Sequence, residues 1–342
     1  MVDTPVARRR PARGGSMIEA TGLRKSYRVG RGRSAGTVEA VRGVDFAVAR
    51  GEIVGFLGPN GAGKSTTMRM LATLIRPDGG RATIAGVDLL RAPAQVRRQI
   101  GFVAQASGTY DDSTARRDLV LQARLYGFGK AEAQRRAEAA IGAFQLGDFA
   151  DRRIRTYSGG QRRRLDVALG VIHSPQVIFL DEPTAGLDPP SRVRMWQEVR
   201  RLRAEGMTVF LTTHYLDEAD TLCDRVSIID GGLIVAEGTP SDLKREISGD
   251  VVAVDLNRAG VVDDVTDNDL PVATKLLTEQ PYVHSSEVVD GTLRLYVDSA
   301  ATAIPQIMRT LLGRGIEPGA IEARRPSLDD VFLAKTGRSL EE

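Results

Sequence analysis

A glycine-rich segment with the pattern G-x-x-x-x-G-K-[ST] is the part of the sequence with the clearest chemistry. It follows the apolar run Ile53–Leu57 and precedes residues of helical character, so a strand, a loop and a helix are predicted. In such a loop, backbone N–H groups and the positive end of the helix surround an anionic oxygen cluster. Lys64 can reach the β- and γ-phosphates of a nucleotide, and the Ser65 hydroxyl can ligate Mg²⁺. The residues predicted to bind a nucleoside triphosphate are Gly58, Pro59, Asn60, Gly61, Ala62, Gly63, Lys64, Ser65 and Thr66.

Two carboxylates end a second apolar run, VIFLDEP at residues 177–183. The run predicts a buried parallel strand, and α/β sheets bind ligands at the carboxyl ends of such strands. Asp181 is suited to hold Mg²⁺, and Glu182 is suited to take a proton from the water that attacks the γ-phosphate. A third apolar run, residues 208–213, ends at His214, which has the position of a γ-phosphate sensor. A purely structural role is the alternative for each of these side chains.

The sequence YSGGQ at residues 157–161 begins another predicted helix. Ser158 can cap this helix, whose first turn again offers free backbone donors. Taken alone, the segment is more simply interpreted as a helix cap than as a binding site. His173 and His284 have no comparable context and carry no functional prediction.

Composition limits the classes of protein that the chain can belong to. Of its 342 residues 42% are apolar, which is enough for two or three domains with ordinary cores. Lys and Arg number 47 against 44 Asp and Glu, so charge gives no support for a nucleic-acid partner. The single cysteine, Cys223, excludes an intrachain disulfide and is interpreted as a core thiol in a reducing compartment. No stretch approaches the roughly 20 apolar residues of a membrane-spanning helix, so a membrane function requires a partner.

The elements that position these residues fall into three parts. Residues 1–16 contain arginine, proline and glycine without an apolar segment, so a disordered basic tail is predicted, and Met17 is an alternative start. Residues 17–243 are predicted to form an α/β domain with a polar loop at 28–40 and an inserted helical subdomain at about 106–157. The remainder of the chain is predicted to form a separate C-terminal domain.

Together, GPNGAGKST, Gln105, YSGGQ, VIFLDEP, AGLD and His214 resemble in order and spacing the nucleotide-binding subunits of ATP-binding-cassette (ABC) transporters. The resemblance covers about residues 18–243. It implies an ABC-type P-loop ATPase core with an edge β-subdomain and a helical subdomain, and it implies ATP and Mg²⁺ as cofactors. The placement of SGGQ shortly before the DE strand separates this family from other P-loop ATPases.

The family pattern implies roles for the residues around the phosphates. Gln105 would join Ser65 and Asp181 around Mg²⁺ and the attacking water. Glu182 would be the catalytic base, and His214 would contact the γ-phosphate. The implied catalytic residues are Lys64, Gln105, Glu182 and His214.

The same resemblance implies a dimer that closes on ATP and opens after hydrolysis. Asp188 would communicate across the interface, and Tyr27 would stack on the adenine unless it is an ordinary buried edge tyrosine. Tyr157 stands where the family most often has leucine, and only a modest effect on packing is expected. The residues that would close over the γ-phosphate bound by the opposite protomer are Ser158, Gly159, Gly160 and Gln161.

A membrane-spanning partner subunit is also implied. The family docks a helix of that subunit in a groove beside Gln105 and the helical subdomain, a region that includes residues 107–113. The chain would therefore lie at the cytoplasmic face of the cell membrane as a peripheral subunit, without a nucleic-acid partner.

Residues 244–342 show the order βαββαβ, which is similar to a ferredoxin-like sandwich and predicts a small α+β accessory or regulatory domain. They end with LDDVFLAKTG at 328–337. With this tail and domain the chain resembles the daunorubicin-resistance type of drug-export ATPases, which drive efflux of amphipathic antibiotics or lipids. A terminal helix capped by Ser327 or Asp329 is the alternative interpretation of the tail. ATPases for the export of polysaccharide, lipid or sodium remain alternatives.

Three other classes of protein fit the sequence less well. Non-transport ABC ATPases of translation or DNA repair have two cassettes in one chain, long coiled coils or zinc-binding cysteines, and this sequence has none of these. A binding protein with an inactive ATP site would lack one of the residues Lys64, Asp181, Glu182 and His214. An importer subunit usually has a different C-terminal module.

Overall fold

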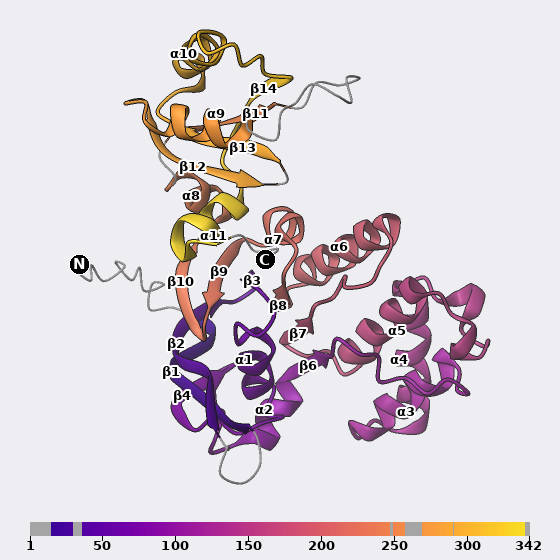
Figure 1. Cartoon of the computed structure of the whole chain (residues 1–342). Helices are drawn as coiled ribbons and strands as arrows, with labels where there is room; N and C mark the ends of the chain where they lie inside the picture. The colour runs from indigo at the N-terminus through magenta and orange to yellow at the C-terminus, as the bar shows by residue number, and fades with distance from the viewer. Residues whose placement is uncertain (1–14, 30–35, 247–248, 257–268, 290, 339–342) are drawn as a thin grey trace. The chain divides into compact units, whose positions relative to one another are not determined.

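The computed structural model describes residues 15–29, 36–246, 249–256, 269–289 and 291–338 (Figure 1). Internal packing divides the chain into two compact units, one up to Pro240 and the other over Ser241–Ser339. Most of the predicted basic tail lies outside the described residues. Of that tail only Gly15 and Ser16 are described, and Ser16 already begins a strand.

The first unit begins with a long antiparallel hairpin. β1 (Ser16–Val29) and β2 (Gly36–Ala49) pair as far as Val29 and Gly36. The loop predicted over residues 28–40 is therefore too long, and its central residues 30–35 lie outside the described part. Pairing outweighs the turn-like composition because each strand satisfies the backbone hydrogen bonds of the other. β4 (Gly79–Ile84) and β5 (Val87–Asp88) complete a sheet of order β2-β1-β4-β5.

A six-stranded sheet of order β10-β9-β3-β8-β7-β6 is the second layer of this unit, and only β10 runs antiparallel to its neighbour. Its strands are β3 (Ile53–Leu57), β6 (Ile100–Val103), β7 (Val177–Asp181), β8 (Thr208–Thr213), β9 (Arg225–Asp230) and β10 (Leu233–Gly238). β3, β7 and β8 are buried along their whole length, as expected for parallel strands made of apolar runs. The strand predicted over 177–183 ends early, because Glu182 has a left-handed φ of 47°.

The core of the first unit is aromatic. The ring of Phe56 lies 4.6 Å from that of Phe210 and 5.0 Å from that of Phe46, so residues of β2, β3 and β8 meet there. Each buried phenylalanine contributes about 2 kcal/mol through the hydrophobic effect. α1 (Lys64–Leu71) and α2 (Pro93–Gln99) belong to the same core, whereas α6 (Pro189–Ala204) and α7 (Leu216–Leu222) pack against β8 and β3.

The helical subdomain consists of α-helices with short connections (Figure 1), and it extends past the predicted end at about residue 157. The helices are α3 (Ala115–Leu125), α4 (Lys130–Ala143) and α5 (Gly159–Val171), with short 3₁₀ turns at Gly147–Phe149 and Ile154–Thr156. Their buried faces are rich in alanine, which allows the helices to pack closely. α5 packs against α3 and β6, so it connects the subdomain to the six-stranded sheet. No helix in the described ranges is both long and apolar enough to cross a membrane.

The second unit is a four-stranded sheet of order β12-β13-β11-β14. Its strands are β11 (Asp250–Asp255), β12 (Val283–Val289), β13 (Thr292–Val297) and β14 (Ala320–Arg324). α9 (Asp269–Thr278) and α10 (Ala300–Leu312) form one core with the sheet, around Val252, Leu293 and Leu295. The antiparallel pairing and strand order are those of the predicted ferredoxin-like sandwich. α8 (Pro240–Arg245) spans the boundary predicted between residues 243 and 244.

The C-terminal helix α11 (Leu328–Thr336) is fixed by a buried carboxylate. Ser327 caps the helix, and Asp330 is 1% exposed. The Asp330 carboxylate accepts hydrogen bonds from Ser327, from the Tyr296 hydroxyl at 2.7 Å and from Arg324 at 2.8 and 3.0 Å. Burial opposes ionisation, but the hydrogen bonds from Ser327 and Tyr296 and the charge of Arg324 outweigh it and lower the pKa of Asp330.

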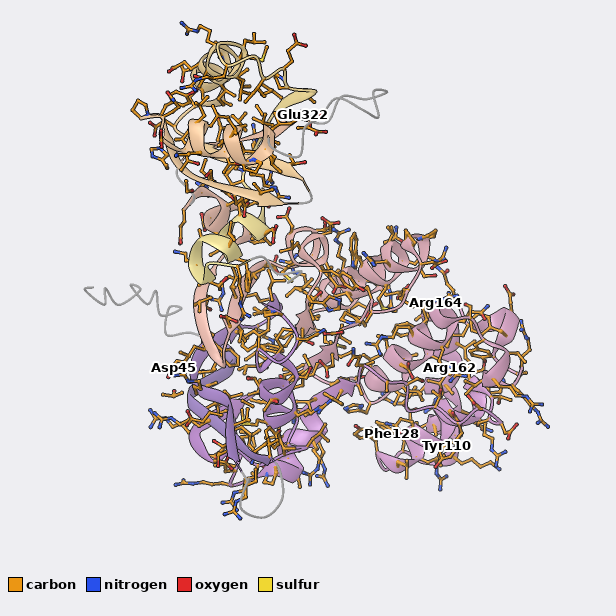
Figure 2. All side chains as sticks on the ribbon, in the orientation of Figure 1. Asp45, Tyr110, Phe128, Arg162, Arg164 and Glu322 are labelled. Carbon is orange, nitrogen blue, oxygen red and sulfur yellow. The ribbon has the colours of Figure 1, made fainter. Side chains whose placement is uncertain are left out.

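Replacing Asp330 by alanine is expected to destabilise the second unit by about 3 kcal/mol, because Arg324 loses its ion pair and the Ser327 N–H its acceptor, while the Tyr296 hydroxyl keeps only Glu287. Since the folded pKa is lowered, the wild type holds this stabilisation above the ordinary aspartate pKa and loses it as the pH falls through the lowered value. Urea unfolding of the whole chain, followed by hydrogen exchange of residues 241–338, measures the effect. The exposed Glu322 of β14 (Figure 2), replaced by alanine, is the control. Equal protection in both variants would contradict the prediction.

Candidate nucleotide-binding and catalytic site

The strand order brings together residues that are far apart in the sequence. The Lys64 loop follows β3, His214 follows β8, Asp181 ends β7, and Gln105 comes shortly after β6. In the order β3-β8-β7-β6 these strands are immediate neighbours and parallel, so all four segments lie at one edge of the sheet (Figure 1). This is the edge where α/β sheets bind ligands.

The loop after β3 folds around the ammonium group of Lys64. Lys64 Nζ donates hydrogen bonds to the carbonyl oxygens of Gly58 at 2.6 Å and Pro59 at 3.0 Å. Burial lowers the pKa of Lys64, while the nearby carboxylates of Glu182 and Asp181 oppose that shift. Gly63 must be glycine here, because its φ is 103° and an added Cβ would lie 2.4 Å from the Ala40 carbonyl oxygen.

Asp181 has one satisfied and one free carboxylate oxygen. Its Oδ1 accepts hydrogen bonds from Ser65 Oγ at 2.7 Å and Thr212 Oγ1 at 2.6 Å. Its Oδ2 is buried and has no hydrogen-bond partner among the described residues. A buried carboxylate oxygen in this state requires a cation or a donor, and oxygen ligands are those that Mg²⁺ prefers. Ser65 and Asp181 therefore fit a magnesium ion.

The Glu182 carboxylate lies between Gln105 and His214. Its Oε2 accepts a hydrogen bond from Gln105 Nε2 at 2.8 Å. His214 Nδ1 lies 3.3 Å from Oε1, without the alignment of a hydrogen bond. The left-handed backbone at Glu182 costs about 1 to 3 kcal/mol and is held by Thr212, whose carbonyl and hydroxyl both accept from the Glu182 N–H at 3.1 Å. This strained backbone conformation sets the direction in which the Glu182 carboxylate points.

The sequence predicted no role for three residues that lie near this site in the structure. Arg163 is buried although it stands in a run of arginines that is typical of a solvated helix face. Thr212 lies in a mostly apolar strand, and its hydroxyl near the strand end is the feature of the sequence that could have indicated a role at the site. Glu218 is buried in α7 and accepts from Thr184 Oγ1 at 2.8 Å and Trp196 Nε1 at 3.1 Å. Burial raises the pKa of Glu218.

The SGGQ segment forms the start of α5. Ser158 and Gln161 cap each other reciprocally, which is the predicted capping role. Asp188 caps α6 by accepting from the Ser191 N–H at 3.0 Å. In the described ranges no hydrogen bond or ion pair joins SGGQ to the Lys64 loop of the same chain. A polar cavity of about 120 Å³ is lined by Ser158, Gly160, Gln161, Arg164, Ser191 and Arg194.

The two tyrosines singled out in the sequence have different environments. Tyr27 lies in β1 and is 39% exposed, so it is not the buried edge tyrosine that was the alternative. Tyr157 is buried, stacks edge-to-face on Phe149, and donates from its hydroxyl to the Phe149 carbonyl oxygen at 2.6 Å. A tyrosine is thus accommodated there with its hydroxyl satisfied.

The parallel sheet, its glycine loop with Lys64, the acidic strand end and the helical subdomain that starts at SGGQ define a P-loop ATPase of the ABC class. Comparisons with known proteins agree with this class. The family model for ABC transporters matches residues 41–185, and the model described as "ATP-binding protein DrrA1-3-like, C-terminal domain" matches residues 238–336.

Curated relatives span nearly the whole chain. It is 41% identical over 327 residues to the daunorubicin resistance ATP-binding protein DrrA2 of Streptomyces coeruleorubidus, covering 96% of this chain and 97% of that one. It is 42% identical over 324 residues to the doxorubicin resistance ATP-binding protein DrrA of Mycobacterium tuberculosis, with 93% of each covered. The chain belongs to the DrrA-like family of ABC transporter ATP-binding proteins, and it is an ATPase subunit of an export system.

Solved structures match the first unit. A structure described as the ATP-binding subunit of an ABC transporter gives a TM-score of 0.59 at 29% identity, covering 68% of this chain and 93% of that one. The dimeric ATP-binding cassette MJ0796, in a post-hydrolysis state with ADP and Pi, gives 0.59 at 26% identity, covering 65% and 98%. The fold and nucleotide binding predicted from the sequence are thereby confirmed.

Proposed function

We propose that this chain drives the efflux of an amphipathic antibiotic or lipid through a separate membrane-spanning subunit. The observation that carries the proposal is that similarity to the daunorubicin and doxorubicin resistance proteins extends over both units, including residues 238–336. A likeness confined to the first unit would support the ATPase activity alone. The Nod factor export ATP-binding protein I of Ralstonia nicotianae, 36% identical over 328 residues and covering 95% of each chain, makes export of a compound other than a drug the second candidate.

The geometry supports a division of roles around the nucleotide. Gly58–Thr66 would hold the phosphates and the exposed ring of Tyr27 would stack on the adenine. Ser65, Asp181 and Gln105 would hold Mg²⁺, which would neutralise charge on the β- and γ-phosphates.

Water activation would fall to the Glu182 carboxylate. It is 7% exposed and acidic, and it lies at the edge of the sheet where the loop, Asp181 and Gln105 meet. Gln105 would orient this carboxylate. His214, which lies beside Glu182 in the structure, would contact the γ-phosphate.

A second copy would complete each ATP site. Within one chain, SGGQ is engaged in its own capping box and is not bonded to the Lys64 loop. The open donors of the α5 N-terminus and the cavity beside them suit the γ-phosphate of ATP held by a partner protomer. Asp188, at the start of α6, would lie at the interface.

The membrane subunit would dock in a groove between the sheet and the helical subdomain. The groove measures about 360 Å³ and is lined in part by Leu74, Phe102 and Tyr126, with Arg97 and Asp166 as charged groups. Leu74 is 55% exposed and Tyr110 is 80% exposed. Tyr110, labelled in Figure 2, lies in the segment that follows Gln105. These apolar side chains suit one face of a helix, and the chain would thereby be held at the cytoplasmic side of the membrane. The second unit would be an accessory or regulatory domain.

The test is drug accumulation in cells that co-express this chain with a membrane subunit encoded next to it. Cells with the wild-type chain should accumulate less of at least one amphipathic antibiotic than cells with Glu182→Gln at the same expression level. If wild-type and Glu182→Gln cells accumulate every antibiotic tested equally while the wild-type chain hydrolyses ATP, these drugs are ruled out as substrates and the proposal shifts to lipids.

A further inference from the structure

Arg163 is a buried cation bound to backbone carbonyl oxygens. Its side chain leaves α5 two residues after the SGGQ segment and is 6% exposed, whereas its neighbours Arg162 and Arg164 (Figure 2) are less deeply buried. Burial lowers the pKa of Arg163, and the carboxylates of Asp166 and Asp181 oppose that shift. Burying a charged guanidinium costs free energy unless each of its N–H donors, which have a fixed planar geometry, finds a hydrogen-bond acceptor.

Those acceptors come from the two segments that carry the catalytic groups. Arg163 Nε donates to the Pro183 carbonyl oxygen at 2.9 Å, and Nη2 donates to those of Asp181 at 2.9 Å and Glu182 at 3.2 Å. Nη1 donates to the carbonyl oxygen of Ala104 at 2.5 Å. One guanidinium therefore holds both the turn at Glu182 and the residue that precedes Gln105.

The turn at Glu182 depends on such support. Its left-handed φ of 47° is unfavourable for a residue with a Cβ, and it persists only where the surroundings over-determine the backbone. Thr212 fixes the N–H side of the turn and Arg163 fixes the carbonyl side. A shift of the turn would move the Glu182 carboxylate away from Gln105, which it now meets at 2.8 Å.

We propose that Arg163 is a positioning residue for ATP hydrolysis: it holds the Glu182 carboxylate and Gln105 in register, and it connects them rigidly to the helix that begins with SGGQ. The inference rests on the proposed role of Glu182 as base. Lysine at this position cannot perform the same task, because a single ammonium cannot reproduce the planar fork that reaches four carbonyl oxygens.

The experiment measures steady-state ATP hydrolysis and ATP binding by the full chain with Arg163→Lys, Arg163→Gln and, as matched control, Arg162→Lys. Arg162 lies on the same helix and pairs with the exposed Asp111, so its lysine variant should behave as wild type. Arg163→Lys should lower kcat roughly 100-fold, the loss expected for a misplaced catalytic group, with the ATP KM and affinity unchanged because the Lys64 loop is untouched. The same substitution in a Glu182→Gln background should cause no further loss, because Arg163 acts through that carboxylate.

The outcomes distinguish the positioning role of Arg163 from the base assignment of Glu182. A wild-type kcat in Arg163→Lys would overturn the positioning role alone. So would an equal loss of kcat when Arg163→Lys is made in the wild-type chain and in the Glu182→Gln chain. Loss of ATP binding in both Arg163 variants would also overturn it, since Arg163 would then serve the fold. Undiminished turnover in Glu182→Gln would overturn the base assignment, and the positioning role with it.

Discussion

Glu182→Gln is expected to bind ATP as tightly as the wild type and to hydrolyse it at least about 100-fold more slowly, which is the usual contribution of a general base. The amide has nearly the same shape and can still face Gln105, but it cannot accept a proton from water. Because bound ATP is then not consumed, the variant should accumulate as a nucleotide-bound dimer. Phosphate release measures the first effect, and size-exclusion chromatography with light scattering in ATP measures the second.

The control for this variant is Glu205→Gln, since Glu205 is an exposed carboxylate paired with Arg201 at the end of α6. Its turnover should equal that of the wild type. Equal turnover in Glu182→Gln would remove Glu182 as the base, and a Glu182→Gln chain that stays monomeric in ATP would argue against the closed dimer.

Lys64→Ala is expected to lose ATP affinity itself, by about 100-fold, because it removes a charged donor to the phosphates worth roughly 3 kcal/mol. Lys64 Nζ now binds the carbonyl oxygens of Gly58 and Pro59, so the ammonium is already desolvated and directed into the loop. Isothermal titration calorimetry with Mg²⁺ and ATP measures the affinity.

Lys130→Ala is the control for Lys64, because Lys130 is an exposed lysine at the start of α4. Wild-type ATP affinity in Lys64→Ala, with unchanged circular dichroism, would contradict the phosphate assignment. The two predictions are separable: Glu182→Gln affects turnover with binding intact, whereas Lys64→Ala affects binding first.

Short-range patterns in the sequence were sufficient to predict several strands and helix ends correctly. The apolar runs at 53–57 and 208–213 are strands with those bounds in the structure. Ser158 caps α5, because its hydroxyl offers an acceptor to backbone N–H groups only three residues away. The order of elements in residues 244–342 also followed from periodicity, and the sheet order of the second unit confirms the ferredoxin-like prediction.

Predictions failed where contacts with residues distant in the sequence determine the backbone conformation. The polar segment 28–40 looked like a loop, yet all of its described residues are strand because β1 and β2 pair along their length. The strand predicted to Pro183 ends at Asp181, because Glu182 turns left-handed under contacts from Thr212 and Arg163. Neither partner lies within the segment itself.

The reactive side chains and the glycine loop that holds Lys64 could be identified from the sequence, because a glycine loop, a capping serine and apolar runs act over a few residues. The tertiary structure sets β3, β8, β7 and β6 side by side, which brings Lys64, His214, Asp181 and Gln105 to one edge. It also decided that Arg163 is buried against the backbone of Glu182. The reason is physical: strand order and the acceptors of a buried guanidinium arise from long-range packing, and no short stretch of sequence encodes them.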